Sequence, residues 1–349
     1  MRKKKIGLLI AACISISLLG ACGNNKNEVE TLPSTSQILD TTQNIETSTE
    51  QSQQIVLEYP QNMKEKGYTE ALILEQMPQK AVLMSSTPVL ALYQLGVPMI
   101  AVPKSTVVTW PEDLAAKAEE LNVVMNSNFD IETVVAMEPD LVILGYTNAD
   151  TYGKILEEVN IPVYYVDAGH TVSYESIKQQ TEVLVKAFGA DSQAGKDMMQ
   201  AFTDLEARLE ETKQKYQGKT VMVLQSAPPS HYIQTKDGTL GSMLNMLGFT
   251  NVYENSASSM AEIDMEVALS YNPDLVLCVG ASKTAEEHKK LMEEDFANNL
   301  AYWNSISAIE RGDIIYLPNS YISSAGINII DNINQLIEII DKHYESNEE

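Results

Sequence analysis

The chain has 349 residues, of which 44% are hydrophobic, and its formal net charge is −24. Nucleic acid and anionic lipid surfaces are poor partners for so acidic a protein. Beyond residue 2 the only arginines are Arg208 and Arg311, so we do not expect a site that clamps a highly anionic ligand between several guanidinium groups.

Residues 1–21 have the organisation of a secretory signal. Arg2–Lys5 is positively charged, and Ile6–Leu19 is an apolar stretch too short for a dedicated membrane span. The Leu-Gly-Ala-Cys that follows resembles the bacterial lipobox, which implies cleavage before Cys22 and attachment of lipid to its sulfur. We therefore expect a lipid-anchored protein on the outer face of a Gram-positive-like cytoplasmic membrane. The alternative is a secreted protein with an unmodified cysteine.

Residues 22–57 are dominated by Asn, Thr, Ser, Gln and Glu. Such a composition buries no core, so a disordered tether is expected here. Cys13 leaves with the signal and Cys22 carries the lipid, which leaves Cys278 without a cysteine to pair with. No intramolecular disulfide is therefore expected.

Residues 58–189 alternate between short apolar runs and helical patterns, which predicts a lobe with a parallel sheet covered by helices. Strands are expected at 81–84, 99–102, 141–144 and 163–166, and helices at 89–95 and 174–188. Gly96 and Gly189 are expected to end the two helices.

Residues 190–216 carry an uninterrupted charged helical pattern, which predicts one long helix that bridges two lobes. Residues 217–349 repeat the alternation of the first lobe. Strands are expected at 220–224, 275–278 and 313–317, helices at 241–247 and 327–344, and a loop at 226–232. The predicted fold is α/β, with two Rossmann-like lobes of parallel sheet joined by a single bridging helix.

An internal repeat supports two related lobes. DIETVVAMEPDLVIL begins at Asp130, and DMEVALSYNPDLVLC begins at Asp264. In each copy an aspartate caps a short amphipathic helix, Pro-Asp ends that helix, and an apolar run follows as a buried strand. The long spacing excludes a solenoid. A chance likeness between two common helix–strand corners is the alternative.

Ligands of open α/β sheets bind outside the carboxyl ends of the strands. If the two lobes face each other, the loops at those ends line one cleft. The candidate ligand contacts in these loops are Ser86, Thr87, Trp110, Tyr146, Asn148, His170, His231, Tyr232, Ser282 and Tyr321. Aromatic and amide side chains suit a flat, partly apolar and weakly charged ligand. A packing or surface role is the alternative for each residue.

Several stretches together resemble the bacterial ABC-transporter solute-binding lipoproteins. They are the lipobox, KAVLMSSTPVLALYQLG, both copies of the repeat, SHYIQTKDGTLGSMLNMLGFTNVYE and WNSISAIERGDIIYLPNS. The resemblance covers about residues 81–340 and is to the class that captures iron–siderophore complexes, heme or cobalamin. It implies a monomeric receptor without a cofactor of its own, an ABC permease and its ATPase as partners, and a heme or ferric siderophore as ligand. Cobalamin or another corrinoid is the alternative ligand.

The same resemblance implies where the permease docks. In this family one exposed glutamate on each lobe enters a basic pocket of the permease, and these positions fall on Glu132 and Glu266. Stabilising the N-terminus of its own helix is an alternative, and compatible, role for each.

The ligand itself is less well specified. SHYIQTKDG and EDFANNLAYWNSISAIERGDIIYL are most similar to heme-receptor lipoproteins of Gram-positive cells, which hold iron between a methionine and a histidine. Here Ser127 stands at the methionine position, with Met125 two residues earlier, and the histidine position falls in 278–282. His231 or Tyr232 is the candidate substitute as axial ligand.

Enzyme chemistry has little support in the sequence. No HExxH, GxSxG, Walker A or CxxC pattern occurs. A surface-anchored enzyme or an adhesin therefore stays only as an alternative from another class, and we expect a binding protein.

Overall fold

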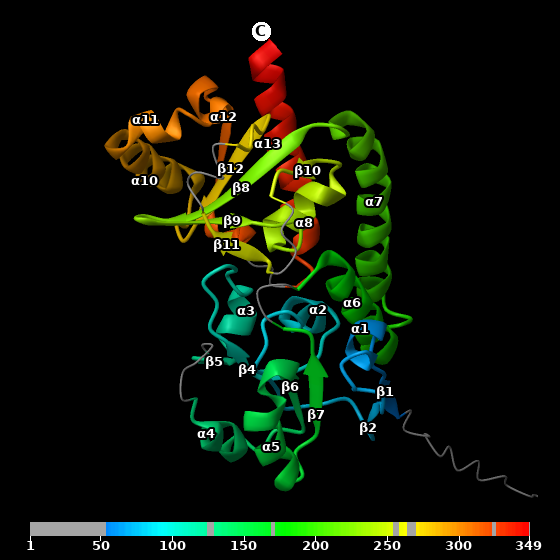
Figure 1. The fold of residues 1–349 in the computed structure, drawn as a ribbon. Coiled ribbons are helices and arrows are strands. Elements are labelled where there is room, and N and C mark those ends of the chain that lie inside the picture. The colour runs from blue at the N-terminus through cyan, green and yellow to red at the C-terminus, as the bar shows by residue number, and fades with distance from the viewer. Residues whose placement is uncertain are drawn as a thin grey trace, which may run out of the picture. The chain divides into compact units, whose positions relative to one another are not determined.

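The computed structural model describes residues 54–123, 129–168, 172–253, 258–263, 270–322 and 326–348 (Figure 1). The chain divides into two units, residues 1–50 and 51–349, and every element described below belongs to the second. The predicted signal, Cys22 and the tether up to residue 53 lie outside the described residues. None of the described helices combines the length and the apolar character that crossing a membrane requires.

The first sheet is parallel throughout, as predicted, with the strand order β5-β4-β3-β6-β7. Its strands are β3 (Ala81–Leu83), β4 (Met99–Pro103), β5 (Glu119–Leu121), β6 (Leu141–Gly145) and β7 (Val163–Val166). Every residue of β3, β6 and β7 is buried, because both faces of the sheet are covered. The short edge strand β5 is missed by the sequence pattern, since Glu119 and Glu120 are exposed.

Short helices and one long helix connect these strands. They are α1 (Gln61–Lys64), α2 (Val89–Gln94), α3 (Glu112–Ala115), α4 (Ile131–Ala136), α5 (Lys154–Glu158) and α6 (Tyr174–Phe188), with the 3-10 turn η1 (Tyr146–Asn148) and the π-helical turn η2 (Ala149–Gly153). An antiparallel pair, β1 (Ile55–Leu57) and β2 (Leu72–Leu74), precedes the main sheet. The helix α2 ends as predicted, because Gly96 adopts a left-handed conformation with φ of 74°.

The second sheet is mixed rather than purely parallel. Its order is β11-β9-β8-β12-β13, with β10 also paired to β8. The strands are β8 (Thr220–Ala227), β9 (Ser230–Gln234), β10 (Thr250–Asn251), β11 (Met260–Glu262), β12 (Leu275–Gly280) and β13 (Ile314–Leu317). The strands β8, β10, β12 and β13 are parallel, whereas β9 and β11 run antiparallel to their neighbours.

The loop predicted at 226–232 is therefore wrong. Most of that segment belongs to β8 and β9, and only Pro228-Pro229 connects the two strands. Pro228-Pro229 occupies only the tip of a hairpin. The following His-Tyr-Ile-Gln carries the aromatic and β-branched residues that favour a strand.

The helices of the second lobe are α8 (Thr239–Met246), α10 (Ala285–Asn298), α11 (Leu300–Trp303), α12 (Ser307–Arg311) and α13 (Ile329–Glu348), with the 3-10 turn η3 (Asn319–Tyr321). The helix α10 begins with a capping box, in which Thr284 and Glu287 satisfy each other's backbone N–H groups. Its inner side packs on β8 and β12, where Cys278 is fully buried and burial raises the pKa of its thiol.

The predicted bridging helix is α7 (Gln193–Tyr216), which extends from α6 to the start of β8 (Figure 1). Glu206 of α7 accepts hydrogen bonds from Lys178 Nζ at 2.5 Å and Tyr174 Oη at 3.2 Å, both on α6. Two residues later, Arg208 donates to Asn334 Oδ1 of α13 at 2.6 Å. Glu206 thus connects α7 to the first lobe, and Arg208 connects it to the C-terminal helix.

The Pro-Asp of the internal repeat has the same role in both lobes. The Asp140 carboxylate accepts the backbone N–H groups of Gln79 at 2.6 Å and Lys80 at 2.9 Å, just before β3. The Asp274 carboxylate accepts the N–H of Thr220 at 2.7 Å, at the first residue of β8. Each aspartate therefore ties the start of the central strand to the strand that follows Pro-Asp. The helix of the second copy, residues 264–269, lies outside the described residues.

Candidate ligand-binding site

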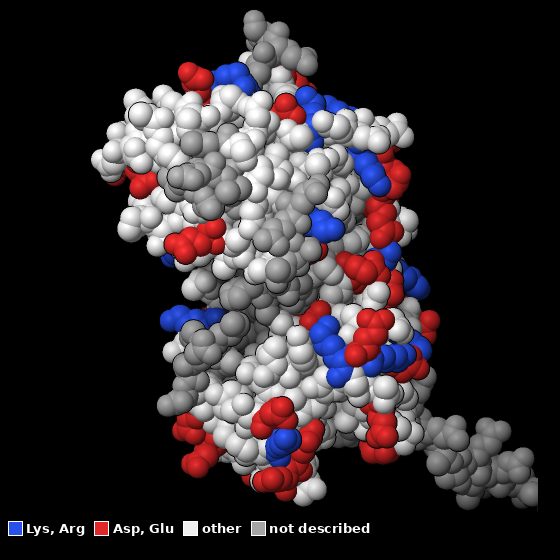
Figure 2. Space-filling view, in the orientation of Figure 1, with Lys and Arg blue, Asp and Glu red and all other residues white. Residues whose placement is uncertain are grey.

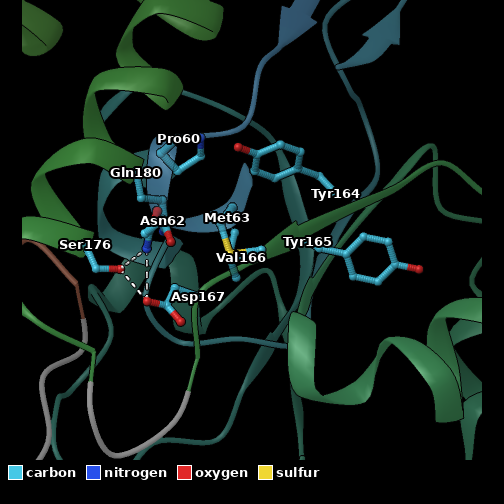
Figure 3. Close-up of a pocket in the computed structure, with 9 residues that line it drawn as sticks. All are labelled: Pro60, Asn62, Met63, Tyr164, Tyr165, Val166, Asp167, Ser176 and Gln180. Carbon is cyan, nitrogen blue, oxygen red and sulfur yellow. Dashed lines mark hydrogen bonds between the residues drawn. The ribbon is translucent and has the colours of Figure 1, made fainter. Parts of the chain in front are cut away.

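The carboxyl edge of the first sheet carries a polar cluster around Asp167, which directly follows β7. Its Oδ2 accepts hydrogen bonds from Ser176 Oγ at 2.6 Å and from Asn62 Nδ2 at 3.1 Å, and the three side chains point toward one another in Figure 3. Lys66 Nζ lies 3.6 Å from Asp167 Oδ1. These side chains fill the space between them and leave no room there for a ligand. The cluster therefore fixes the end of β7 to α1 and α6.

Tyr146 and Asn148, both predicted ligand contacts, lie half-buried in η1 at this same edge. Lys66 Nζ lies 5.1 Å from the centroid of the Tyr146 ring, within cation–π range. This contact connects Tyr146 to the Asp167 cluster. The residues of that cluster are not among the predicted ligand contacts. A signal for Asp167 existed, since it is a charged residue at the end of a buried strand.

Ser86 and Thr87 lie in the turn between β3 and α2. Ser86 is half-buried, and its carbonyl accepts the N–H of Val89 at 3.3 Å. Thr87 is buried, and its carbonyl lies so close to Gly326 that any side chain at residue 326 would clash with it. Thr87 therefore supports the segment that leads into α13, and only Ser86 keeps surface for a ligand.

Trp110 and Tyr321 are buried, contrary to the prediction that they line a cleft. The indole N–H of Trp110 donates to the carbonyl of Pro103 at 2.9 Å and closes the loop after β4. The hydroxyl of Tyr321 donates to the carbonyl of Asn332 at 3.2 Å, and burial raises the pKa of Tyr321 to about 12. Large aromatic side chains gain more from complete burial than from an exposed loop position.

Loops from the two sheets meet near Ser282, another predicted contact. The half-buried Ser282 follows β12, and its carbonyl accepts the backbone N–H of Asn319 at 2.8 Å. The Asn319 side chain donates in turn to the carbonyl of Thr106 at 3.1 Å, in the loop after β4. The loops that carry the predicted contacts Trp110, Ser282 and Tyr321 therefore contribute to one hydrogen-bonded group.

His231 is held on both sides of its ring. Nδ1 lies 2.9 Å from Ser226 Oγ, and Nε2 lies 3.2 Å from Asp295 Oδ2. Burial lowers the pKa of His231, and the carboxylate of Asp295 only partly opposes that shift. A neutral ring that accepts from Ser226 and donates to Asp295 satisfies both nitrogens. An axial iron ligand needs a free nitrogen, so this arrangement speaks against His231 in that role.

Tyr232 follows His231 along β9, and strand alternation places its side chain on the other face of the sheet. It is half-buried, and its neighbours in the register are Gln225 of β8 and Glu262 of β11. The hydrogen bonds that argue against His231 as an axial ligand do not involve Tyr232. Tyr232 therefore stays a candidate for that role.

Ser226, His231 and Asp295 have the residue types of a hydrolytic triad. Ser226 is only 2% exposed, within β8. No substrate carbonyl can approach its hydroxyl, which a nucleophilic serine requires. The three residues therefore form a structural hydrogen-bond network.

Glu132, the predicted docking residue of the first lobe, is exposed in the first turn of α4. Its backbone N–H donates to the capping carboxylate of Asp130 at 3.0 Å, so the predicted cap is confirmed. The other predicted site residues Met125, His170 and Glu266 lie outside the described residues. Within the described part of the chain, no group of three or more His, Cys, Asp or Glu side chains is arranged to hold a metal ion.

Residues 82–321 match the family model described as periplasmic binding protein. Because the match covers more than half of the chain, this protein belongs to that family. It is therefore a binding protein rather than an enzyme, and it carries a ligand rather than a cofactor of its own.

Solved structures of binding proteins share the fold. The heme complex of IsdE from Staphylococcus aureus is 19% identical with a TM-score of 0.59, over 74% of this chain and 98% of that one. The petrobactin-binding protein YclQ from Bacillus subtilis is 18% identical with a TM-score of 0.61, over 83% and 98%. The vitamin B12-binding protein BtuF of Vibrio cholerae is 15% identical with a TM-score of 0.58, over 77% and 98%. No curated protein matches this chain in sequence.

Proposed function

We propose that this protein is the lipid-anchored extracellular receptor of an ABC importer. It captures an iron complex, heme or a ferric siderophore, in the cleft between its lobes and delivers it to the permease. Its membership of the periplasmic binding protein family supports this function, as does the likeness of its fold to heme-, petrobactin- and vitamin B12-binding structures. A corrinoid is the second candidate ligand.

The observation that carries the proposal is the hydrogen bond from Asn319 to the carbonyl of Thr106. Thr106 follows β4 of the first sheet, and Asn319 follows β13 of the second. The loops at the two carboxyl edges thus face each other, at the position where ligands of open α/β sheets bind. A ligand held there contacts both lobes and can favour their closed arrangement.

The distribution of charge favours a weakly charged ligand over a polyanion. Both arginines of the folded part are already engaged, Arg208 with Asn334 and Arg311 with Asp313. On the face shown in Figure 2, basic side chains are scattered among acidic ones and form no broad basic surface. A ligand with several carboxylates would find few of the bidentate partners that it needs.

For docking we propose Glu132 and Glu266, one on each lobe. The exposure of Glu132 supports this role, because a docking carboxylate has to reach a basic partner. Alanine at both positions is expected to abolish uptake by cells while ligand affinity in solution stays unchanged. Unchanged uptake by the double variant would refute the assignment.

The decisive experiment is an absorbance titration of the soluble chain, from Gly23 onward, with heme. A saturable Soret shift that Tyr232→Phe alters supports heme with a phenolate ligand. No shift refutes heme as ligand. A thermal-shift screen of ferric hydroxamates and corrinoids then decides between the remaining classes, and a screen without any stabilised complex would refute the whole ligand proposal.

A further inference from the structure

A pocket of about 380 Å³ lies beside the β8–β9 hairpin of the second lobe. The residues that decide its chemistry are His231, Asp295, Trp303, Glu262, Asn298 and Asn299. Its volume is at the lower end of the range for small-molecule sites. It shares no residue with the Asp167 cluster of the first lobe.

A glycine near the pocket allows α10 to approach the sheet closely. Gly280 ends β12 beside Ser226 of β8, and Ser226 in turn pairs with His231 of β9. The ring of His288 from α10 occupies the place where a side chain at residue 280 would stand. This close approach seats α10 on the sheet, and two helical turns further along, at Asp295, the helix reaches His231.

The charge of the pocket is negative. Asp295 is the carboxylate on the His231 face of the sheet, whereas Glu262 pairs with Tyr232 and directs its side chain to the other face. Among the described residues that line the pocket there is no lysine or arginine. His231 does not neutralise Asp295, because burial lowers the pKa of the imidazole and keeps it uncharged. Within the described part of the chain, His231 is the only basic residue found within ion-pair distance of Asp295.

The remaining walls suit a small group rather than an extended one. Trp303, whose ring meets the ring of His231 edge-on with centroids 5.0 Å apart, closes one side and is 2% exposed. Asn298 and Asn299 end α10 beside it and offer amide oxygens as acceptors. An aromatic wall, the carboxylate of Asp295 and two amides together match a group that has positive charge, several N–H donors and an apolar stem.

We propose that this pocket binds an organic ammonium group. The ammonium nitrogen donates to Asp295 and to the amide oxygens, and its alkyl stem packs on Trp303. An anion is repelled by Asp295, and a neutral sugar has no charge for that carboxylate to attract. The group can belong to a free amine or to an amine-bearing arm of the transported ligand. The second source rests on the function proposed above, and the first does not.

The test uses the two tryptophans of the chain as separate reporters. The protein is labelled with 5-fluorotryptophan and titrated with putrescine, followed by fluorine NMR. We expect the Trp303 resonance to shift saturably and the resonance of Trp110, bound to Pro103, to stay in place. Succinate, a dianion of similar length, is expected to shift neither.

A matched pair of variants separates binding from the general attraction of amines to an acidic protein. Asp295→Asn is expected to weaken putrescine binding at least tenfold, and Glu262→Gln to weaken it less. Glu294→Gln removes the same charge from the neighbouring, exposed position of α10 outside the pocket, and should leave binding unchanged. Equal effects of Asp295→Asn and Glu294→Gln, or no saturable shift of Trp303, would overturn the proposal.

Two iron chelates then distinguish the sources of the amine. Ferrioxamine B has a terminal ammonium group, and its N-acetyl derivative has the same chelate without that charge. A Trp303 shift and tighter binding with ferrioxamine B alone support a ligand arm, whereas equal behaviour of both chelates beside a putrescine shift supports a free amine. A putrescine shift without binding of any iron complex or corrinoid keeps the pocket and refutes the function proposed above.

Discussion

The two lobes share one half of their sheets and differ in the other half. In both, Pro-Asp precedes a buried strand that runs parallel to the central strand, and the aspartate ties the two strands together. On the far side of the central strand, the first lobe adds the parallel strands β4 and β5. The second lobe instead turns back at Pro228-Pro229 and adds the antiparallel strands β9 and β11, and its parallel strand on this side is only the short β10.

The difference teaches what an internal repeat can predict. The copied residues end with Pro-Asp and the strand that follows it. Only the side of the sheet that contains this strand is therefore the same in both lobes. After β3 the chain enters a turn and α2, whereas β8 continues for eight residues and folds back as a hairpin. That hairpin brings His231 to Asp295 and forms one wall of the pocket beside them.

The largest expected effect is the difference in stability cost between alanine at Gly280, which ends β12, and alanine at Gly145, which ends β6. A methyl group at Gly280 would meet the buried ring of His288 and, at 2.5 Å, the carbonyl of Ser226, neither of which can move freely. At Gly145 it would clash with the Ala168 methyl group, at 2.7 Å, while Thr147 Oγ1 at 3.9 Å is an ordinary contact. We expect Gly280→Ala to lower the free energy of unfolding by about 2–3 kcal/mol and Gly145→Ala by about 1 kcal/mol, measured by urea denaturation. A larger loss for Gly145→Ala would contradict this account.

The next effect tests the shared Pro-Asp. Asp140→Ala and Asp274→Ala each leave backbone N–H groups without their acceptor, and we expect each to cost about 1–2 kcal/mol of unfolding free energy. Asp140→Asn and Asp274→Asn keep one acceptor oxygen and should cost less. Thermal denaturation of the four variants provides the comparison, and a stable Asp274→Ala protein beside an unstable Asp140→Ala protein would show that the roles differ.

A smaller effect concerns the two halves of α7. Glu206→Gln weakens the contacts to α6, and Arg208→Gln weakens those to α13. These groups are partly exposed, so each change should cost only about 0.5–1 kcal/mol. We expect hydrogen exchange to rise in α6 for the first variant and in α13 for the second. Identical exchange patterns would show that Glu206 and Arg208 do not stabilise different neighbours of α7.

The smallest effect concerns pH, because it is absent at neutral pH and develops only on acidification. Burial lowers the pKa of His231, His288 and His343, all in the second lobe, from the ordinary value of 6.5. Below about pH 6.5 the unfolded chain therefore binds more protons than the folded one, and stability falls as the pH decreases. The stabilising contribution of these neutral rings is complete above that pH.

Hydrogen exchange is measured at pH 7 and at about pH 5.5 and corrected for the intrinsic rates. We expect the loss of protection on acidification to be larger in the second lobe than in the first. His288→Met should reduce this pH dependence, because the buried ring of His288 has no described hydrogen-bond partner for either nitrogen. Loss of protection mainly in the first lobe would contradict the assignment.

Much of the architecture was predictable because it depends on local patterns. Buried strands of a parallel sheet are continuous apolar runs, and β3, β4, β6, β7 and β12 all lie within a few residues of their predicted positions. The long charged run after Gly189 indicates α7 for a similar reason, since no glycine or proline interrupts it after Gly195. The polar strand β5 and the hairpin of β8 and β9 were missed, because their pairing partners, and not their own composition, make them strands.

The site was less predictable than the fold. The sequence by itself determined the family, the two lobes, the capped helix at Asp130 and the loops in which a ligand site can lie, because each depends on residues close together in the chain. Only the tertiary structure decided that Trp110 and Tyr321 are buried, that His231 uses both ring nitrogens, and that Asp167 gathers Asn62, Lys66 and Ser176 around it. Those outcomes depend on partners up to 114 positions apart, and side-chain burial and hydrogen bonding are settled by such distant neighbours.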